Sequence, residues 1–220
     1  MDTNLNSPRE HAINVLKDSV TKEIWESNCN FVTTLRHQIK LHSLATNPIM
    51  DALNKGTFHL EAIQKIHLEY RHASGQIFTE ALLMAQFQTR QFEPRLSPSS
   101  KIPERFLFTI KTLDELGFQP GHHRAGYYLG NPAYAHYPLF EKVLDGLGIS
   151  QQERQNYVPN ADSDRVRNFL ENSYGRYVGV VALLAVAELQ VIIFSPPEAT
   201  KRTAWIALLG DWQALIILGI

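Results

Sequence analysis

One long apolar segment, VGVVALLAVAELQVIIF, constrains the fold more than any other feature of the chain. It runs from Val178 to Phe194 and holds sixteen uncharged residues and one carboxylate, Glu188. The segment is a little short for a membrane span and carries its charge at the centre, so we predict a buried core helix. An isolated buried carboxylate is normally protonated, paired or bound to a metal ion. Glu188 therefore needs a hydrogen-bonding partner or a metal.

Apolar residues recur at helical spacing through most of the remaining sequence, and no stretch alternates with the period of a strand. Ser7 and Pro8 form a start signal for the first helix, and Gly56, Gly117 and Gly148 are placed to end later ones. We predict an all-α, single-domain bundle of about seven helices over residues 1–220. The expected helices cover residues 7–27, 31–56 with a break near 47–48, 57–87, 104–117, 136–148, 162 or 164 through 188, and 198–220.

The composition narrows the class of function. A formal net charge of -1 over 220 residues gives no electrostatic reason to expect a nucleic acid or an anionic membrane as a partner. The polar N-terminus has no apolar signal core and Cys29 is the single cysteine, so we expect a cytoplasmic protein. Nine histidines are more than a chain of this size usually carries, which makes metal or proton chemistry worth testing.

The motif LDELG places two carboxylates, Asp114 and Glu115, at the end of a predicted helix. Such a pair is ordinarily solvated. However, the helix dipole disfavours anions at a C-terminus, so a positively charged group is expected nearby.

Three histidine motifs could add ligands. His136 opens the segment HYPLF, where a surface or capping role is the simpler reading. Glu69 and His72 have the Glu-x-x-His spacing that directs two side chains at one metal ion in di-iron bundles, although the motif is short. His122 and His123 are adjacent in a loop rich in glycine and aromatics, so at most one of them is expected to reach a common ion.

Taken in order, these segments resemble the heme-oxygenase-like fold shared by the thiaminase-II (TenA-like) proteins, pyrroloquinoline-quinone biosynthesis protein C and the CADD-like di-iron oxidases. The segment NPIMDALNKGTFHLEAIQKIHLEY is similar to the opening of that fold. LDELG followed by HYPLFEKVLDGLGIS, and then VALLAVAELQ, resemble the metal-binding segments of its di-iron oxidases. The resemblance spans roughly residues 35 to 215.

The resemblance implies a set of metal ligands. Glu115, His136 and Glu188 match the glutamate, its paired histidine and the glutamate of the following helix, and Glu69 is a weaker match to an additional carboxylate. Carboxylates and imidazole suit two iron ions, or manganese, and no heme is expected.

Two features depart from the family pattern. The loop between Glu115 and His136 is longer than usual, which leaves His122 or His123 open as the partner of Glu115. The family's last helix carries a His-x-x-x-Asp-x-x-His cluster, which by spacing would begin at about Ile220, so we expect a missing segment.

Two main functions follow as expectations. The first is a non-heme di-iron oxidase or oxygenase that acts on a small organic substrate with O2. The second is a metal-free small-molecule-binding or cofactorless biosynthetic protein of the TenA-like or PqqC-like type. A homodimer is expected, and a third possibility is a helical protein that acts mainly through such a dimer interface.

Overall fold

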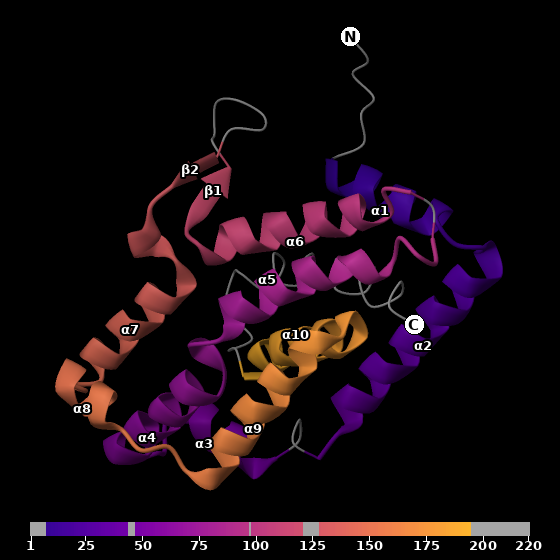
Figure 1. The fold of residues 1–220 in the computed structure, drawn as a ribbon. Coiled ribbons are helices and arrows are strands. Elements are labelled where there is room, and N and C mark those ends of the chain that lie inside the picture. The colour runs from indigo at the N-terminus through magenta and orange to yellow at the C-terminus, as the bar shows by residue number, and fades with distance from the viewer. Residues whose placement is uncertain (1–7, 44–46, 97, 121–127, 195–220) are drawn as a thin grey trace. The chain divides into compact units, whose positions relative to one another are not determined.

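The computed structural model describes residues 8–43, 47–96, 98–120 and 128–194. Within these ranges the regular secondary structure is helical apart from two three-residue strands, which confirms the predicted all-α class (Figure 1). Ten α-helices occur in the described part, which excludes the helix predicted over 198–220; they outnumber the predicted ones because several predicted helices are interrupted and one helix was not predicted. The helices are α1 Pro8–Asp18, α2 Lys22–Leu41, α3 Pro48–Asn54, α4 Leu60–Tyr70, α5 Phe78–Gln88, α6 Lys101–Glu115, α7 His136–Gly146, α8 Gln151–Asn156, α9 Ala161–Asn172 and α10 Tyr177–Phe194.

The first predicted helix is divided in two by side chains that bond to the backbone. The Ser19 hydroxyl donates to the Leu16 carbonyl at 2.6 Å, next to the end of α1. The Thr21 side chain then accepts from the Ile24 N–H and caps α2. Serine and threonine compete with the helical backbone in this way, so apolar spacing alone overestimated the length of the helix.

Two further predicted helices are interrupted by short irregular turns. A π-helical turn at Arg71–Gly75 separates α4 from α5, and a 3-10 turn at Ser173–Gly175 separates α9 from α10. Asn160, rather than Asp162 or Asp164, caps α9 by accepting from the backbone N–H groups of Asp162 and Ser163. Apolar residues continue on both sides of each turn, so the sequence pattern did not reveal the interruptions.

The polar connector after α7 contains a helix that we did not predict. The short helix α8 begins with a capping box in which the side chains and backbones of Ser150 and Glu153 bond to each other. The segment shows no apolar periodicity, so the sequence pattern did not indicate a helix. The capping box was the signal that could have revealed it.

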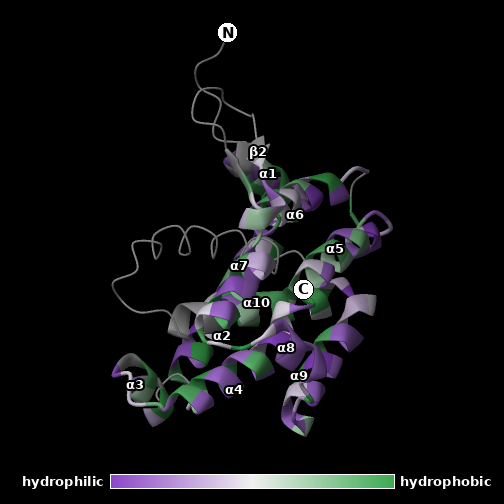
Figure 2. Cartoon of the chain, turned by 90° about the vertical axis from the view of Figure 1, so that its left-hand side faces the viewer, coloured by the Kyte–Doolittle hydropathy of each residue, from purple (hydrophilic) through white to green (hydrophobic). Residues whose placement is uncertain are grey.

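The described chain divides into two compact units. The first unit comprises Met1–Thr57, Ala85–Leu107 and Ser173–Ile220, and includes α10. In its core the ring of Phe92 packs edge-on against that of Tyr177, with 4.4 Å between ring centroids. Helix α10 is apolar along its length, as expected from the sequence (Figure 2), and Val180, Val181 and Leu184 are among its buried side chains.

The second unit comprises Phe58–Met84 and Phe108–Asn172. Its fully buried apolar side chains include Leu82, Phe108 and Leu144. A polar network reinforces this core, because the buried guanidinium of Arg154 donates to the Glu141 carboxylate at 2.8 Å and to the Ile149 carbonyl at 2.7 Å.

A short antiparallel pair of strands follows α6 in the second unit. Strand β1 is Phe118–Pro120 and strand β2 is Tyr128–Gly130, with Phe118 opposite Gly130. We had expected residues 118–135 to be irregular. Runs of three residues are too short to show a period of two, so the sequence pattern gave no sign of them.

None of the helices in the described ranges combines the length and the apolar character needed to cross a lipid bilayer.

Candidate metal centre

A tight turn after α6 brings the end of this helix close to the start of α7. Gly117 has φ +82°, a left-handed conformation that ends the helix as predicted. A Cβ at this position would lie 2.5 Å from the carbonyl oxygen of Asn131 and 2.6 Å from the nitrogen of Ala135. The backbone before α7 therefore packs directly against Gly117, and this close approach places His136 beside Glu115.

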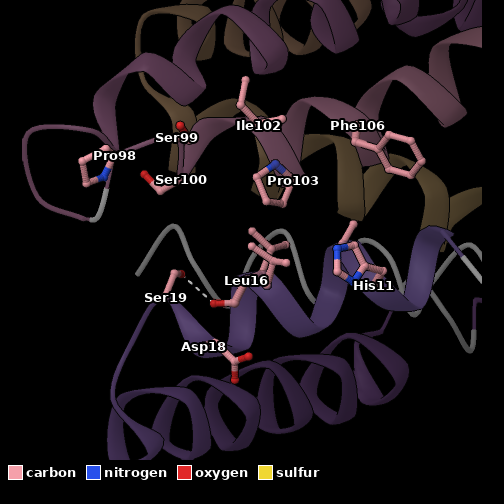
Figure 3. A pocket seen from close by; sticks show the side chains of 12 residues that line it. His11, Leu16, Asp18, Ser19, Pro98, Ser99, Ser100, Ile102, Pro103 and Phe106 are labelled. Atoms are coloured by element: carbon pink, nitrogen blue, oxygen red, sulfur yellow. Dashed lines mark hydrogen bonds between the residues drawn. The ribbon is translucent and has the colours of Figure 1, made fainter. Parts of the chain in front are cut away.

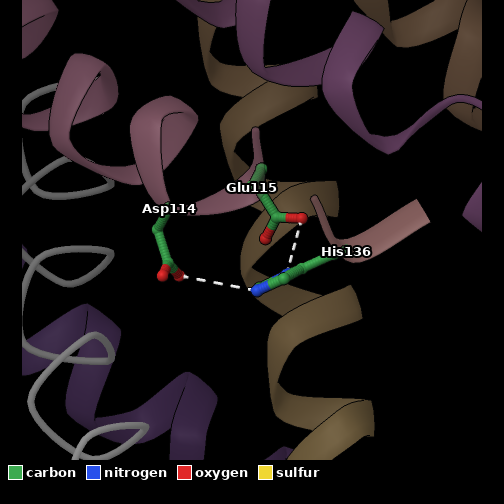
Figure 4. Close-up of side chains that lie close together, drawn as sticks. All are labelled: Asp114, Glu115 and His136. Carbon is green, nitrogen blue, oxygen red and sulfur yellow. Dashed lines mark ion pairs between the residues drawn. The ribbon is translucent and has the colours of Figure 1, made fainter. Parts of the chain in front are cut away.

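Glu115 is the centre of the resulting cluster and is 7% exposed. Its Oε2 lies 2.8 Å from Nδ1 of His136, and its Oε1 lies 2.9 Å from Nζ of Lys111. Figure 4 shows the imidazole edge of His136 turned toward the Glu115 carboxylate. Both oxygens of Glu115 thus face a proton-donating or cationic group.

Asp114 lies at the more open side of the cluster, with its side chain about half exposed at 49%. Its Oδ2 lies 3.9 Å from Nε2 of His136 and 3.8 Å from Nζ of Lys111 (Figure 4). Each of the two ring nitrogens of His136 therefore faces a different carboxylate.

Protonation of the pair follows from these contacts. The hydrogen bond that His136 donates to the Glu115 carboxylate raises the pKa of His136, and the partial burial of the ring opposes this rise. Burial alone would raise the pKa of Glu115, but the His136 hydrogen bond and the Lys111 charge outweigh it and leave that pKa below its ordinary value. The two directions agree, since each partner favours the charged form of the other.

The donor set can hold a metal ion. One ligand atom from each of Asp114, Glu115 and His136 lies within 4.8 Å of the other two. Two carboxylates and an imidazole match the ligand preference of iron and manganese. The ammonium of Lys111 already lies beside the Glu115 carboxylate. The sequence had led us to expect such a positive charge near the carboxylates at the C-terminal end of α6.

The structure brings together Glu115 and His136, two of the residues predicted as ligands. It adds Asp114, whose own carboxylate we had expected to be solvated. Lys111 was not considered from the sequence, although its i,i+4 spacing from Glu115 on a predicted helix was a usable signal.

Glu69, the weaker predicted ligand, is engaged by other residues of the second unit. The Tyr157 hydroxyl donates to its Oε1 at 2.6 Å, and the Asn160 N–H donates to both of its oxygens. Its Glu-x-x-His partner, His72, has Nε2 2.7 Å from Oδ1 of Asp164 instead. Glu69 and His72 therefore bond to different partners near the start of α9.

Glu188 lies in α10, in the first compact unit, and is buried at 3% exposure. This confirms that the apolar helix buries its single carboxylate. His122, His123 and all residues after 194 lie outside the described residues.

Comparisons of the chain with models of known protein families, with curated proteins and with solved structures give no match. The chemistry of the site is therefore argued from its own geometry.

Proposed function

We propose that this chain is a non-heme iron-dependent oxidase or oxygenase with a heme-oxygenase-like helical fold, which oxidises a small organic substrate with O2. The observation that carries the proposal is the convergence of Asp114, Glu115 and His136. The resemblance of the surrounding segments to di-iron oxidases supports the choice of iron over other divalent metals.

Asp114, Glu115 and His136 would hold the ion, which when bound supplies redox chemistry with O2. The chain's own residues prepare the site. Burial keeps water away from Glu115, and the hydrogen bond that His136 donates to Glu115 fixes the orientation of the His136 ring. Lys111 balances the negative charge of the carboxylates.

Metal content after anaerobic loading with ferrous iron tests the proposal. We expect wild-type protein to retain iron after gel filtration, and Glu115→Gln and His136→Gln to lose it. Glu26→Gln is a matched control, since Glu26 is an exposed glutamate whose contact is to Lys22 at 3.7 Å. O2 consumption with candidate substrates would follow retention of iron by the wild type. Wild-type protein that retains no more iron than the His136→Gln variant would refute the iron proposal.

A metal-free function is the second candidate, and the position of Lys111 favours it. The ammonium group lies 2.9 Å from Glu115, so the buried carboxylate already has a counter-charge without a metal ion. Nδ1 of His136 is bonded to Glu115, and the His136 side chain is partly exposed. Its other ring nitrogen, Nε2, could then exchange protons with a bound small molecule. This arrangement suits a cofactorless enzyme or binding protein.

The two candidates differ in their response to chelators. The metal-free candidate predicts the same melting temperature in EDTA and in saturating ferrous or manganous ion. The iron proposal predicts that the metal raises the melting temperature, because an ion that binds only the folded state stabilises it. Glu115→Gln is the control that removes any such rise.

A further inference from the structure

A cavity of about 690 Å3 lies within the first compact unit, between α1 and the start of α6 (Figure 3). This volume falls in the range of roughly 300–1,000 Å3 that is usual for small-molecule sites. Its lining in the described part of the chain includes none of Asp114, Glu115 and His136, so it is a different site from the candidate metal centre.

The middle of the cavity is apolar on both walls. Leu16 and Ala12 of α1 form one wall and are buried, at 0% and 5% exposure. Ile102 and Phe106 of α6 form the facing wall and are 52% and 40% exposed. Figure 3 labels Leu16 on α1, and Ile102 and Phe106 on the facing α6. Such walls bind a hydrocarbon chain or ring and would bury the exposed parts of Ile102 and Phe106.

One polar group in the lining has no partner that would explain its burial. Ser100 is 4% exposed, and its Oγ makes no hydrogen bond with any described residue. A serine directly before a helix normally accepts from an N–H of the first turn. Here Pro103 has no N–H, and the Ile102 N–H donates to the Ser99 carbonyl at 2.9 Å. The Ser100 hydroxyl therefore lacks a partner among the described residues, and a ligand that reaches it would supply one.

The N-terminal end of α6 favours an anion beside Ser100, and the acidic residue that its first turn carries, Glu104, is fully buried. Ser100 directly precedes α6, a helix of fifteen residues whose N-terminal end carries partial positive charge. Asp18 is the acidic residue of the lining, but Figure 3 shows its carboxylate directed away from α6. Lys101 does not compete for the ligand because its ammonium lies 2.7 Å from Glu93.

We propose that this cavity binds a small amphipathic monocarboxylate. The carboxylate accepts from the Ser100 hydroxyl at the N-terminal end of α6, and the apolar body lies between Leu16 and Ile102 toward Phe106. The ligand class follows from the pairing of an apolar slot with one buried hydroxyl donor at a helix N-terminus.

Calorimetric titration of the whole chain with decanoate, below its micelle concentration, tests the proposal. Decanol serves as the uncharged control of equal chain length. We expect saturable decanoate binding in wild type and about tenfold weaker binding in Ser100→Ala, the loss typical of a hydrogen bond to a charged group, with decanol binding unchanged. Ile102→Trp fills the slot from a half-exposed position and should abolish the binding of both ligands.

Three outcomes would overturn the proposal. The first is wild-type protein that binds neither ligand, and the second is Ile102→Trp that binds decanoate as well as wild type. The third is equal affinity for decanoate and decanol in both wild type and Ser100→Ala, which would leave an apolar site without carboxylate recognition. Circular dichroism melts of each variant confirm that the protein compared is folded.

Discussion

The ammonium of Lys111 and the carboxylate of Glu115 lie 2.9 Å apart, one turn from each other on α6, and both side chains are buried. The same carboxylate bonds to His136 through its other oxygen. Glu115 is thus fully engaged by groups of its own chain. A metal ion at this site would share the Glu115 carboxylate with Lys111 or displace the ammonium, because both cations bind carboxylate oxygens.

Lys111→Met is therefore expected to raise the affinity for a divalent metal by about tenfold, since it removes a positive charge from beside the ligands. Titration of Mn2+ followed by calorimetry measures this change. Lys142→Met, at an exposed position of α7, is the control and should leave the affinity unchanged. Weaker metal binding in Lys111→Met would show instead that the lysine supports the site.

His136→Gln should destabilise the metal-free protein in a pH-dependent way. The raised pKa of His136 means that its contribution is complete below the ordinary value of 6.5 and is lost as the pH rises through the folded-state pKa. The lowered pKa of Glu115 means that its contribution is complete above 4.5 and is lost as the pH falls through the folded-state pKa. The pair therefore contributes most between these two ordinary values.

Urea unfolding in EDTA at about pH 5.5 and about pH 9 measures this dependence. Because His136 is partly exposed, we expect a difference of about 1 kcal/mol between wild type and His136→Gln at the lower pH and a smaller one at the higher pH. An equal difference at both values would contradict the assigned ion pair.

Gly117→Ala should disrupt the turn that joins the two halves of the candidate metal centre. The added Cβ would meet the backbone of Asn131 and Ala135, which cannot give way without moving α7. Gly148→Ala is a matched control, with a similar positive φ of +77° but no atom within 4 Å of the added Cβ. We expect a loss of about 3 kcal/mol or more for Gly117→Ala and about 1 kcal/mol for Gly148→Ala in thermal unfolding.

Glu104→Gln should stabilise the protein at neutral and alkaline pH. Glu104 is fully buried, and burial raises its pKa from 4.5 to about 7, against a smaller opposing effect of its own backbone N–H. As the pH rises from 4.5 to about 7, the unfolded chain releases this proton before the folded one does, so wild-type stability falls across that range.

The stability gained by Glu104→Gln should reach at most about 3 kcal/mol above pH 7 and vanish near pH 4. Chemical denaturation of both proteins over this pH range measures it. A constant difference at all pH values would mean that Glu104 has the same pKa in the folded and the unfolded chain, which would contradict the raised pKa.

Arg154→Met should destabilise the second unit by about 3 kcal/mol, because it leaves the partly buried Glu141 without one of its cations and the Ile149 carbonyl without its donors. Arg165→Met is the control, since the pair of Arg165 with Asp162 is exposed and should contribute less than about 0.5 kcal/mol. Thermal unfolding of the two variants distinguishes a buried network from a surface pair.

The sequence by itself determined the helical class, the ends of α6 and α7 at glycines, and the burial of Glu188 in an apolar helix. These features depend on local propensity and on the spacing of apolar residues along a single helix. It also identified Glu115 and His136 as candidate partners, but only through a resemblance between ordered motifs.

Only the tertiary structure decided which side chains meet. The turn at Gly117 places His136 against Glu115, whereas Glu69 bonds to Tyr157 and Asn160 across an interval of about ninety residues. The role of Lys111 likewise depends on the burial of both partners. Distances across the fold depend on turns and packing between elements far apart in sequence, and helical periodicity carries no information about them.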